Sequence, residues 1–280
     1  MNEILEVRGL CKRYPAFALD DVSFSLSPGR ITGFIGRNGA GKSTTLRSLL
    51  GYAQPDAGEV RFFGLDFAAH AGEIKARVGY VSNGMQYYAN RRLRAITDVT
   101  RRFYPGWDDA LYRRYMADFG LDETKTPAML SNGMKVKYAL ALALSHRADL
   151  LILDEPSSGL DPVSREDLLE TFLALRDEGR TLLFSTHITE DLDKCADDIL
   201  YISGGRIRAH APLPDFVAGY RLVRWRAGEL SPEQEAKTRG RRREKDGSSA
   251  LIAASDAPAF PSATVPDLRD VMVHLESEGV

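Results

Sequence analysis

The chain has 280 residues, with 37 Lys and Arg against 39 Asp and Glu, and 44% of its residues are hydrophobic. These proportions are typical of a soluble globular protein with a large core, and they exclude a small disulfide-stapled scaffold or a disordered chain. A net charge of -2 gives no global attraction to nucleic acid, so an anion would need a local site.

The N-terminal sequence, the apolar stretches and the cysteines all favour a cytoplasmic chain. Residues 1–6 carry acidic side chains where a signal peptide would carry positive charge. The longest apolar stretch, residues 138–153, is interrupted by charged residues and is too short to cross a bilayer. The two cysteines, Cys11 and Cys195, lie far apart in the sequence, which suits a reducing compartment. We therefore expect a chain that does not enter the membrane by itself.

The first 50 residues predict strands followed by a loop and a helix. Alternating apolar positions at residues 4–7 and 22–26, with a turn signal at 27–29, predict an antiparallel start. An apolar strand at residues 31–35 then ends in glycine and precedes a helix at 43–50.

The middle of the chain predicts a helical insertion and then strands alternating with helices. Apolar residues recur at steps of three and four over residues 91–121, which indicates helices. Apolar runs at 150–153 and 182–184 flank a helix at 162–178, for which Asp161 is the predicted N-cap. Strands that alternate with helices predict a mostly parallel sheet of the α/β class.

Beyond about residue 211 the composition changes. Residues 237–249 are polar and basic, and a last short helix carries Leu268, Val271 and Met272 on one face. We expect the basic run 239–245 to be a solvated loop, with contact to anionic lipid headgroups as the alternative.

The run from Gly36 to Ser43 fits the phosphate-loop pattern G-x-x-x-x-G-K-[ST]. It stands between a predicted strand and a predicted helix, as the motif requires. Glycines let successive backbone amides point at phosphate oxygens, and the helix N-terminus adds positive potential there. Lys42 would reach the terminal phosphates of a nucleotide, and Ser43 a magnesium ion.

Three further polar residues follow predicted strands. Asp154 and Glu155 end the buried strand at 150–153, at the sheet edge where ligands of open α/β sheets bind. Asp154 would hold magnesium, and Glu155 would act as the general base toward water. His187 follows another strand and could hydrogen-bond a phosphate or orient Glu155, although alone it would count only as a polar boundary residue.

Five motifs in this order resemble those of the ATP-binding cassette (ABC) transporter ATPases. After the phosphate loop come Leu130–Lys135, Leu153–Pro156, Ser158–Pro162 and Ser185–His187. The resemblance covers roughly residues 3–210, and no guanine-reading Asn-Lys-x-Asp motif is present.

The resemblance implies a P-loop NTPase (RecA-like) core in residues 1–210. This core would combine a mostly parallel sheet, an N-terminal antiparallel β subdomain and a helical subdomain at about 87–147. Residues 211–280 would be a small C-terminal accessory segment.

The resemblance also implies ATP and Mg²⁺ as ligands and a head-to-tail dimer. Each ATP would lie between the phosphate loop of one subunit and the signature residues Ser131 and Gly133 of the other. A helix start offers amides and a dipole for that role, but a simple helix cap explains these two residues equally well in isolation. The residues expected around ATP are Tyr14, which would stack on adenine, Gly36, Asn38, Gly39, Gly41, Lys42, Ser43, Thr44, Ser131, Gly133 and Asp161.

Two departures from the family pattern stand out. Asn132 and Met134 replace the first glycine and the glutamine that usually follow the signature serine. Asn83 stands where the family commonly has a glutamine that senses magnesium and the permease, so the expected metal residues are Ser43, Asp154 and Asn83.

A chain of this family without a membrane span needs a separate integral membrane permease. Residues 85–92 stand where the family receives that partner, and residues 265–272 resemble the tail of bacterial ABC-2-type export ATPases. We therefore predict an exporter ATPase, peripheral on the inner face of the cell membrane through its permease and without a nucleic-acid partner. An importer ATPase and a regulatory nucleotide-binding protein remain the alternatives.

Overall fold

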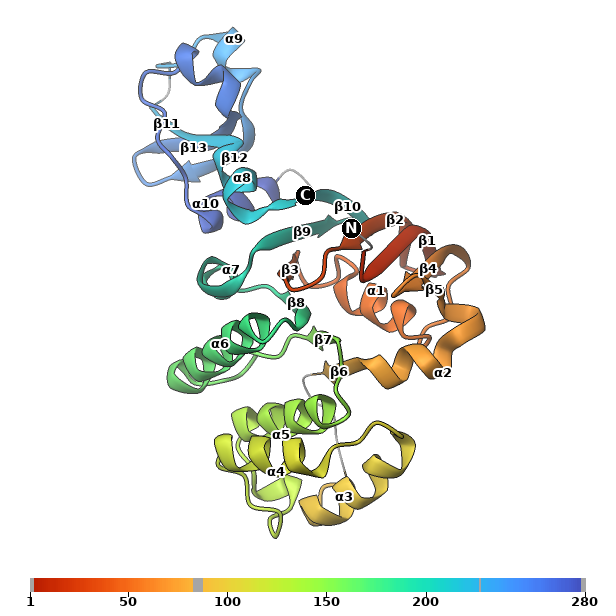
Figure 1. Ribbon diagram of the computed structural model, residues 1–280. Helices are drawn as coiled ribbons and strands as arrows, with labels where there is room; N and C mark the ends of the chain where they lie inside the picture. Colours follow the sequence, from red (N-terminus) through yellow and green to blue (C-terminus); the bar gives the residue numbers. More distant parts are fainter. Residues whose placement is uncertain (1–2, 83–87, 227, 278–280) are drawn as a thin grey trace.

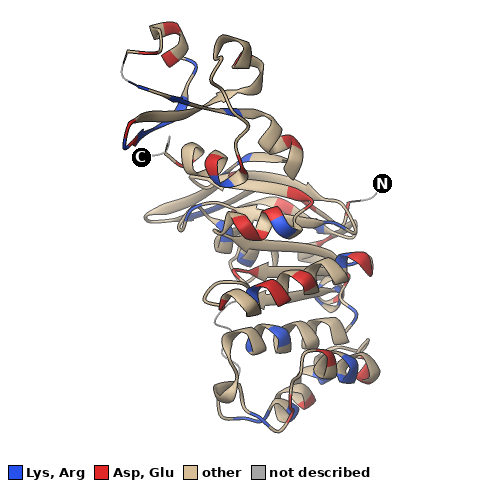
Figure 2. Ribbon diagram, turned by 90° about the vertical axis from the view of Figure 1, so that its left-hand side faces the viewer, with Lys and Arg blue, Asp and Glu red and all other residues tan. Residues whose placement is uncertain are grey.

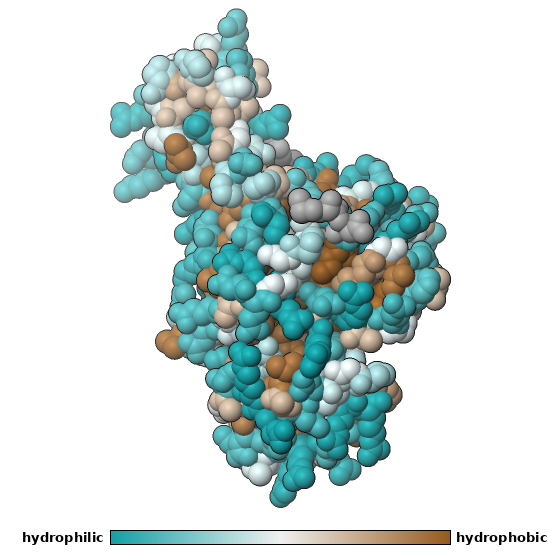
Figure 3. Space-filling model, viewed as in Figure 1, coloured by the Kyte–Doolittle hydropathy of each residue, from teal (hydrophilic) through white to brown (hydrophobic). Residues whose placement is uncertain are grey.

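The computed structural model describes residues 3–82, 88–226 and 228–277. Their strands form three β-sheets. Figure 1 shows the helical region at one end of an elongated molecule and a small C-terminal sheet at the other. Among the described residues, no helix has the length and apolar character needed to cross a membrane. The face in Figure 3 is mostly hydrophilic, with hydrophobic patches over the middle of the molecule.

The central sheet has six strands in the order β10-β9-β3-β8-β7-β6. All neighbours pair in parallel except β9 and β10. Every residue of β3, β7 and β8 is buried, which matches their continuous apolar sequence and a sheet covered on both faces. The predicted α/β class with a mostly parallel sheet is confirmed. The bounds are β3 (Ile31–Ile35), β6 (Val78–Ser82), β7 (Leu150–Asp154), β8 (Thr181–Thr186), β9 (Asp198–Ser203) and β10 (Arg206–Pro212).

The N-terminal sheet is antiparallel, as predicted, but its first strands are longer than the sequence pattern indicated. They extend to a tight connection between Tyr14 and Phe17. Helix α1 joins this sheet to the central one, because its Leu46 and Leu49 share a core with residues of both sheets. The bounds are β1 (Leu5–Tyr14), β2 (Phe17–Leu26), α1 (Lys42–Leu49), β4 (Ala57–Phe62), β5 (Leu65–Asp66) and α2 (Phe67–Arg77).

The helical region contains the predicted helices, interrupted around Pro105 and Gly106. Buried hydroxyls join them: the Thr97 Oγ1 lies 2.9 Å from the hydroxyl oxygens of both Tyr112 and Tyr138. Because all three groups are hydrogen-bonded, their burial is not costly. The elements are α3 (Leu93–Thr100), the 3-10 turns Arg101–Phe103 and Pro127–Met129, α4 (Asp109–Asp118) and α5 (Asn132–Ser145).

Two more helices follow the strands that end at the site. Helix α6 (Pro162–Asp177) begins after Asp161, whose carboxylate accepts from the amides of Val163 and Ser164, as predicted for its cap. Helix α7 (Thr189–Cys195) begins directly after the segment that contains His187.

The C-terminal segment folds as a three-stranded antiparallel sheet in the order β11-β13-β12. The prediction of a solvated loop at residues 239–245 was wrong, because Arg239–Glu244 forms strand β12. This strand lies at the edge of its sheet, where exposed arginines are tolerated and oppose edge-to-edge association. Figure 2 shows basic residues on this sheet and mixed charges on the helices. The other elements are α8 (Leu213–Ala218), β11 (Tyr220–Trp225), α9 (Pro232–Glu235), β13 (Gly247–Ala253), the 3-10 turn Ala254–Ala259 and α10 (Leu268–Leu275).

Helix α10 fixes the C-terminal sheet to the rest of the chain. It presents the predicted apolar face, and Val271 and Met272 share a core with Leu192 and Cys195 of α7. Its His274 also holds the sheet, since the Nδ1 lies 2.7 Å from the Gly240 carbonyl oxygen.

Candidate nucleotide site

The loop between β3 and α1 has the sharply turned backbone that its glycines permit. Gly39 and Gly41 have φ angles of 84° and 118°, which side chains disfavour. Gly36 is needed for space, because a Cβ there would lie 2.3 Å from the Ile202 carbonyl oxygen. The amides of this loop lead directly into the N-terminus of α1, an arrangement suited to bind phosphate.

Lys42 is buried inside this loop, with 5% of its surface exposed. Its Nζ donates to the carbonyl oxygen of Gly36 at 2.6 Å and lies 3.3 Å from Glu155 Oε1. Its three N–H donors are directed at the carbonyl oxygens of Gly36 and Arg37 and at the Glu155 carboxylate, so a phosphate oxygen would replace one of these partners.

Asp154 lies at the end of β7, with 6% exposure. Its Oδ1 accepts hydrogen bonds from Ser43 Oγ at 3.0 Å and from Ser185 Oγ at 2.8 Å. Carboxylate and hydroxyl oxygens are hard ligands of the kind that Mg²⁺ takes beside substrate phosphates, so Ser43 and Asp154 fit that ion. Asn83, the third predicted metal residue, lies outside the described residues.

Glu155 and His187 meet across the ends of β7 and β8. His187 Nδ1 lies 2.8 Å from Glu155 Oε2. Glu155 has a φ angle of 51°, a backbone conformation that costs a side-chain-bearing residue about 1–3 kcal/mol and is concentrated at functional sites. The Glu155 amide donates to Ser185 Oγ at 2.9 Å, which helps to hold the turn.

A cavity of about 400 Å³ opens between the phosphate loop and the Glu155–His187 pair. It is lined by Phe17, Arg37, Asn38, Gly39, Gly41, Lys42, Ser43, Thr44, Glu155, Ser158 and His187.

Phe17, Arg37 and Ser158 line this cavity but were not among the site residues expected from the sequence. Phe17 is the first residue of β2 and pairs with Tyr14, the last residue of β1. From this position its ring reaches Gly41 and the cavity. Tyr14, the predicted adenine-stacking residue, is 46% exposed and does not line the cavity. The alternation along β2 was the signal that could have found Phe17, had the strand been extended to its true start.

The signature residues are not part of this cavity. Ser131 Oγ caps α5 by accepting from the Met134 amide at 3.2 Å. Gly133 packs on α6, where a Cβ would lie 3.2 Å from the Cβ of Ser164. Asp161 caps α6. All three therefore act as helix-end residues within a single chain.

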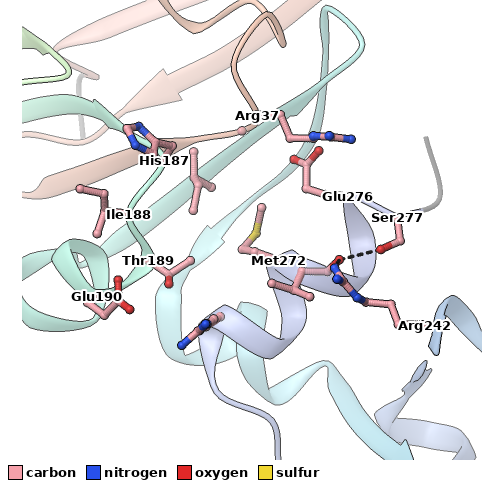
Figure 4. Close-up of a pocket in the computed structure, with 13 residues that line it drawn as sticks. Arg37, His187, Ile188, Thr189, Glu190, Arg242, Met272, Glu276 and Ser277 are labelled. Atoms are coloured by element: carbon pink, nitrogen blue, oxygen red, sulfur yellow. Dashed lines mark hydrogen bonds between the residues drawn. The ribbon is translucent and has the colours of Figure 1, made fainter. Parts of the chain in front are cut away.

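A second cavity, of about 750 Å³, adjoins the first on the side of the C-terminal segment. Figure 4 shows Arg37 and His187 on one side of it and Met272, Glu276 and Arg242 on the other. Helix α10 thus lies beside the phosphate loop and the His187 segment.

A third cavity, of about 230 Å³, is lined by residues of both the core and the helical region. Its lining includes Tyr52, Tyr80, Tyr104 and His146, and the rings of Tyr104 and His146 stack with centroids 4.0 Å apart. Burial lowers the pKa of His146, which favours its neutral form. Tyr52 is 64% exposed, so this groove presents aromatic surface to the outside.

Known proteins are similar to this chain in both sequence and fold. The ABC transporter family matches residues 19–158. Nod factor export ATP-binding protein I of Ralstonia nicotianae is 36% identical over 210 residues, which cover 72% of this chain and 65% of that protein. The chain belongs to the ABC transporter family.

A second relative and a solved structure agree with this assignment. The bacitracin transport ATP-binding protein BcrA of Bacillus licheniformis is 32% identical over 76% of this ABC chain and 71% of its own length. The structure of an ATP-binding subunit of an ABC transporter is 30% identical and has a TM-score of 0.69, covering 76% of this chain and 91% of that one. These matches confirm the predicted family and its P-loop ATPase fold.

Proposed function

We propose that this ABC chain binds ATP with Mg²⁺ and hydrolyses it to power a membrane exporter. The observation that carries the proposal is the assembly of Lys42, Ser43, Glu155 and His187 around one cavity, with Asp154 hydrogen-bonded to Ser43. Each group has a distinct task in phosphoryl transfer to water.

The mechanism follows from the positions of these groups. The loop amides and Lys42 bind the phosphates, and Lys42 exchanges a backbone carbonyl partner for a phosphate oxygen. Glu155 then takes a proton from a water molecule as that water attacks the γ-phosphorus and the bond to the bridging oxygen breaks. His187 orients Glu155 through their hydrogen bond. Ser43 and Asp154 would hold Mg²⁺, which neutralises phosphate charge when bound.

Two copies of the chain complete the site in this proposal. Ser131 and Gly133 stand at the start of α5, where amides and the helix dipole favour an anion, yet they do not line their own cavity. A head-to-tail dimer would bring them to the γ-phosphate held by the second copy, with Asp161 nearby.

The transport partner is an integral membrane permease that docks in the groove around Tyr52 and Tyr104. Exposed aromatic residues are enriched in protein interfaces. Tyr88 is 77% exposed and belongs to the segment 85–92 predicted for this contact, of which residues 85–87 lie outside the described residues. Relatives named for the export of Nod factor support the direction of transport. The chain would then lie at the inner face of the membrane.

Phosphate release by the purified chain with MgATP tests the enzymatic part. We expect turnover that requires both ATP and Mg²⁺, and its absence even with the co-purified permease would contradict the proposal.

Co-purification from membranes tests the partner. Tyr52→Ser should reduce capture of the permease without changing ATP binding, since Tyr52 does not line the nucleotide cavity. Val265→Ser, at an exposed apolar residue of the C-terminal segment, is the control. Equal capture by both variants would exclude the groove as the docking site.

A further inference from the structure

Asp191 is a fully buried carboxylate in the first turn of α7, with 0% exposure. Its Oδ1 accepts from Arg165 Nε of α6. A buried ion pair of this kind would satisfy one oxygen and leave the other in need of donors.

The second oxygen is bound by the two segments that carry the reacting groups. Ser157 Oγ donates to Asp191 Oδ2 at 2.5 Å, and Thr186 Oγ1 lies 3.4 Å from the same oxygen. Ser157 follows Glu155 by two residues, and Thr186 directly precedes His187.

The turn at each of these segments needs such support. Glu155 is in the left-handed region, where the backbone keeps a side-chain-bearing residue only if its surroundings fix it. Thr186 Oγ1 also accepts from the Ile188 amide at 3.0 Å, which fixes the backbone on both sides of His187.

We propose that Asp191 is a positioning residue that holds Glu155 and His187 at hydrogen-bonding distance. One oxygen anchors α7 to Arg165, and the other ties together the segments after β7 and β8. The inference rests on the proposed hydrolysis for its kinetic consequence, but the geometry that it explains is independent of ATP.

The test removes the hydroxyl partner and keeps the ion pair, because loss of Asp191 would leave Arg165 without its buried partner and could unfold the chain. Ser157→Ala should lower kcat about tenfold while the ATP dissociation constant stays within about twofold. Ser157→Thr keeps a hydroxyl and should restore most of the rate. Ser145→Ala is the matched control, since Ser145 is a fully buried serine whose hydroxyl donates to the Ala141 carbonyl oxygen of its own helix.

A second measurement follows the hydrogen bond between His187 and Glu155 directly. The imidazole ¹⁵N resonances of His187, assigned with His187→Gln, should move in Ser157→Ala and Thr186→Val but not in Ser145→Ala. Parental kcat together with unmoved His187 resonances in Ser157→Ala would overturn the proposal. If the parental chain does not hydrolyse ATP, the proposed function fails, and the His187 resonances alone decide whether Asp191 positions this pair.

Discussion

The phosphate-loop half and the signature half of the proposed site differ in how complete they are. In the first, Lys42, Asp154, Glu155 and His187 come from different strands and loops and already contact one another or a shared partner. In the second, Ser131 caps its own helix by accepting from the Met134 amide and does not line the cavity. One half is built by the fold of a single chain, whereas the other would acquire its function only against a second copy.

This difference has an energetic cause. Buried charges such as Lys42 and Asp154 need an ion pair or hydrogen bonds inside the chain, so their geometry is fixed before any ligand arrives. Exposed cap residues such as Ser131 are satisfied by their own helix and are under no such constraint. The variants below separate the two halves.

Glu155→Gln should produce the largest effect on the phosphate-loop half. The substitution keeps size and hydrogen bonding but removes basicity, so ATP hydrolysis should fall about 10²-fold or more. ATP should still bind and hold the dimer closed. Phosphate release and size-exclusion chromatography with ATP measure both effects, and near-parental turnover would remove Glu155 from the mechanism.

Lys42→Ala should weaken ATP binding about tenfold or more, because it removes a buried phosphate-binding charge. Calorimetry with MgATP measures the change. Lys194→Ala serves as the control, since Lys194 is an exposed lysine paired with Glu166 on α6. Unchanged affinity in Lys42→Ala would exclude the assignment of the loop.

Ser131→Ala gives the smallest effect and separates the two roles of the signature serine. Loss of its cap should destabilise the chain by about 1 kcal/mol. Ser231→Ala is a close match, because Ser131 and Ser231 each accept from the amide three residues onward at 3.2 Å. Denaturant unfolding should show similar losses for both, whereas only Ser131→Ala should lower turnover. If Ser131→Ala and Ser231→Ala have equal turnover, Ser131 acts only as a helix cap and takes no part in hydrolysis.

The sequence predicted the parts of this molecule that short-range chemistry dictates. The phosphate loop, the buried strands and the cap at Asp161 depend on residues close together in the chain. Phe17 could not be placed in the cavity, because its position depends on how β1 pairs with β2. Strand β12 was missed for a related reason, since its arginines are tolerated only at the edge of a sheet whose other strands had not been recognised. Local sequence patterns do not contain information on which distant strands pair.

The most direct test of a shared site combines a lesion in each half. Ser131→Arg places a bulky cation where the phosphate held by the second copy must approach, so it should abolish ATP-driven dimerisation and turnover while monomers still bind ATP. A mixed dimer with Lys42→Ala has one site with both lesions and one with neither. At an ATP concentration too low to fill the Lys42→Ala site, neither variant should turn over alone, and an equal mixture should regain about a quarter of the parental rate if single sites can turn over. Parental dimerisation and hydrolysis in Ser131→Arg alone would contradict the account.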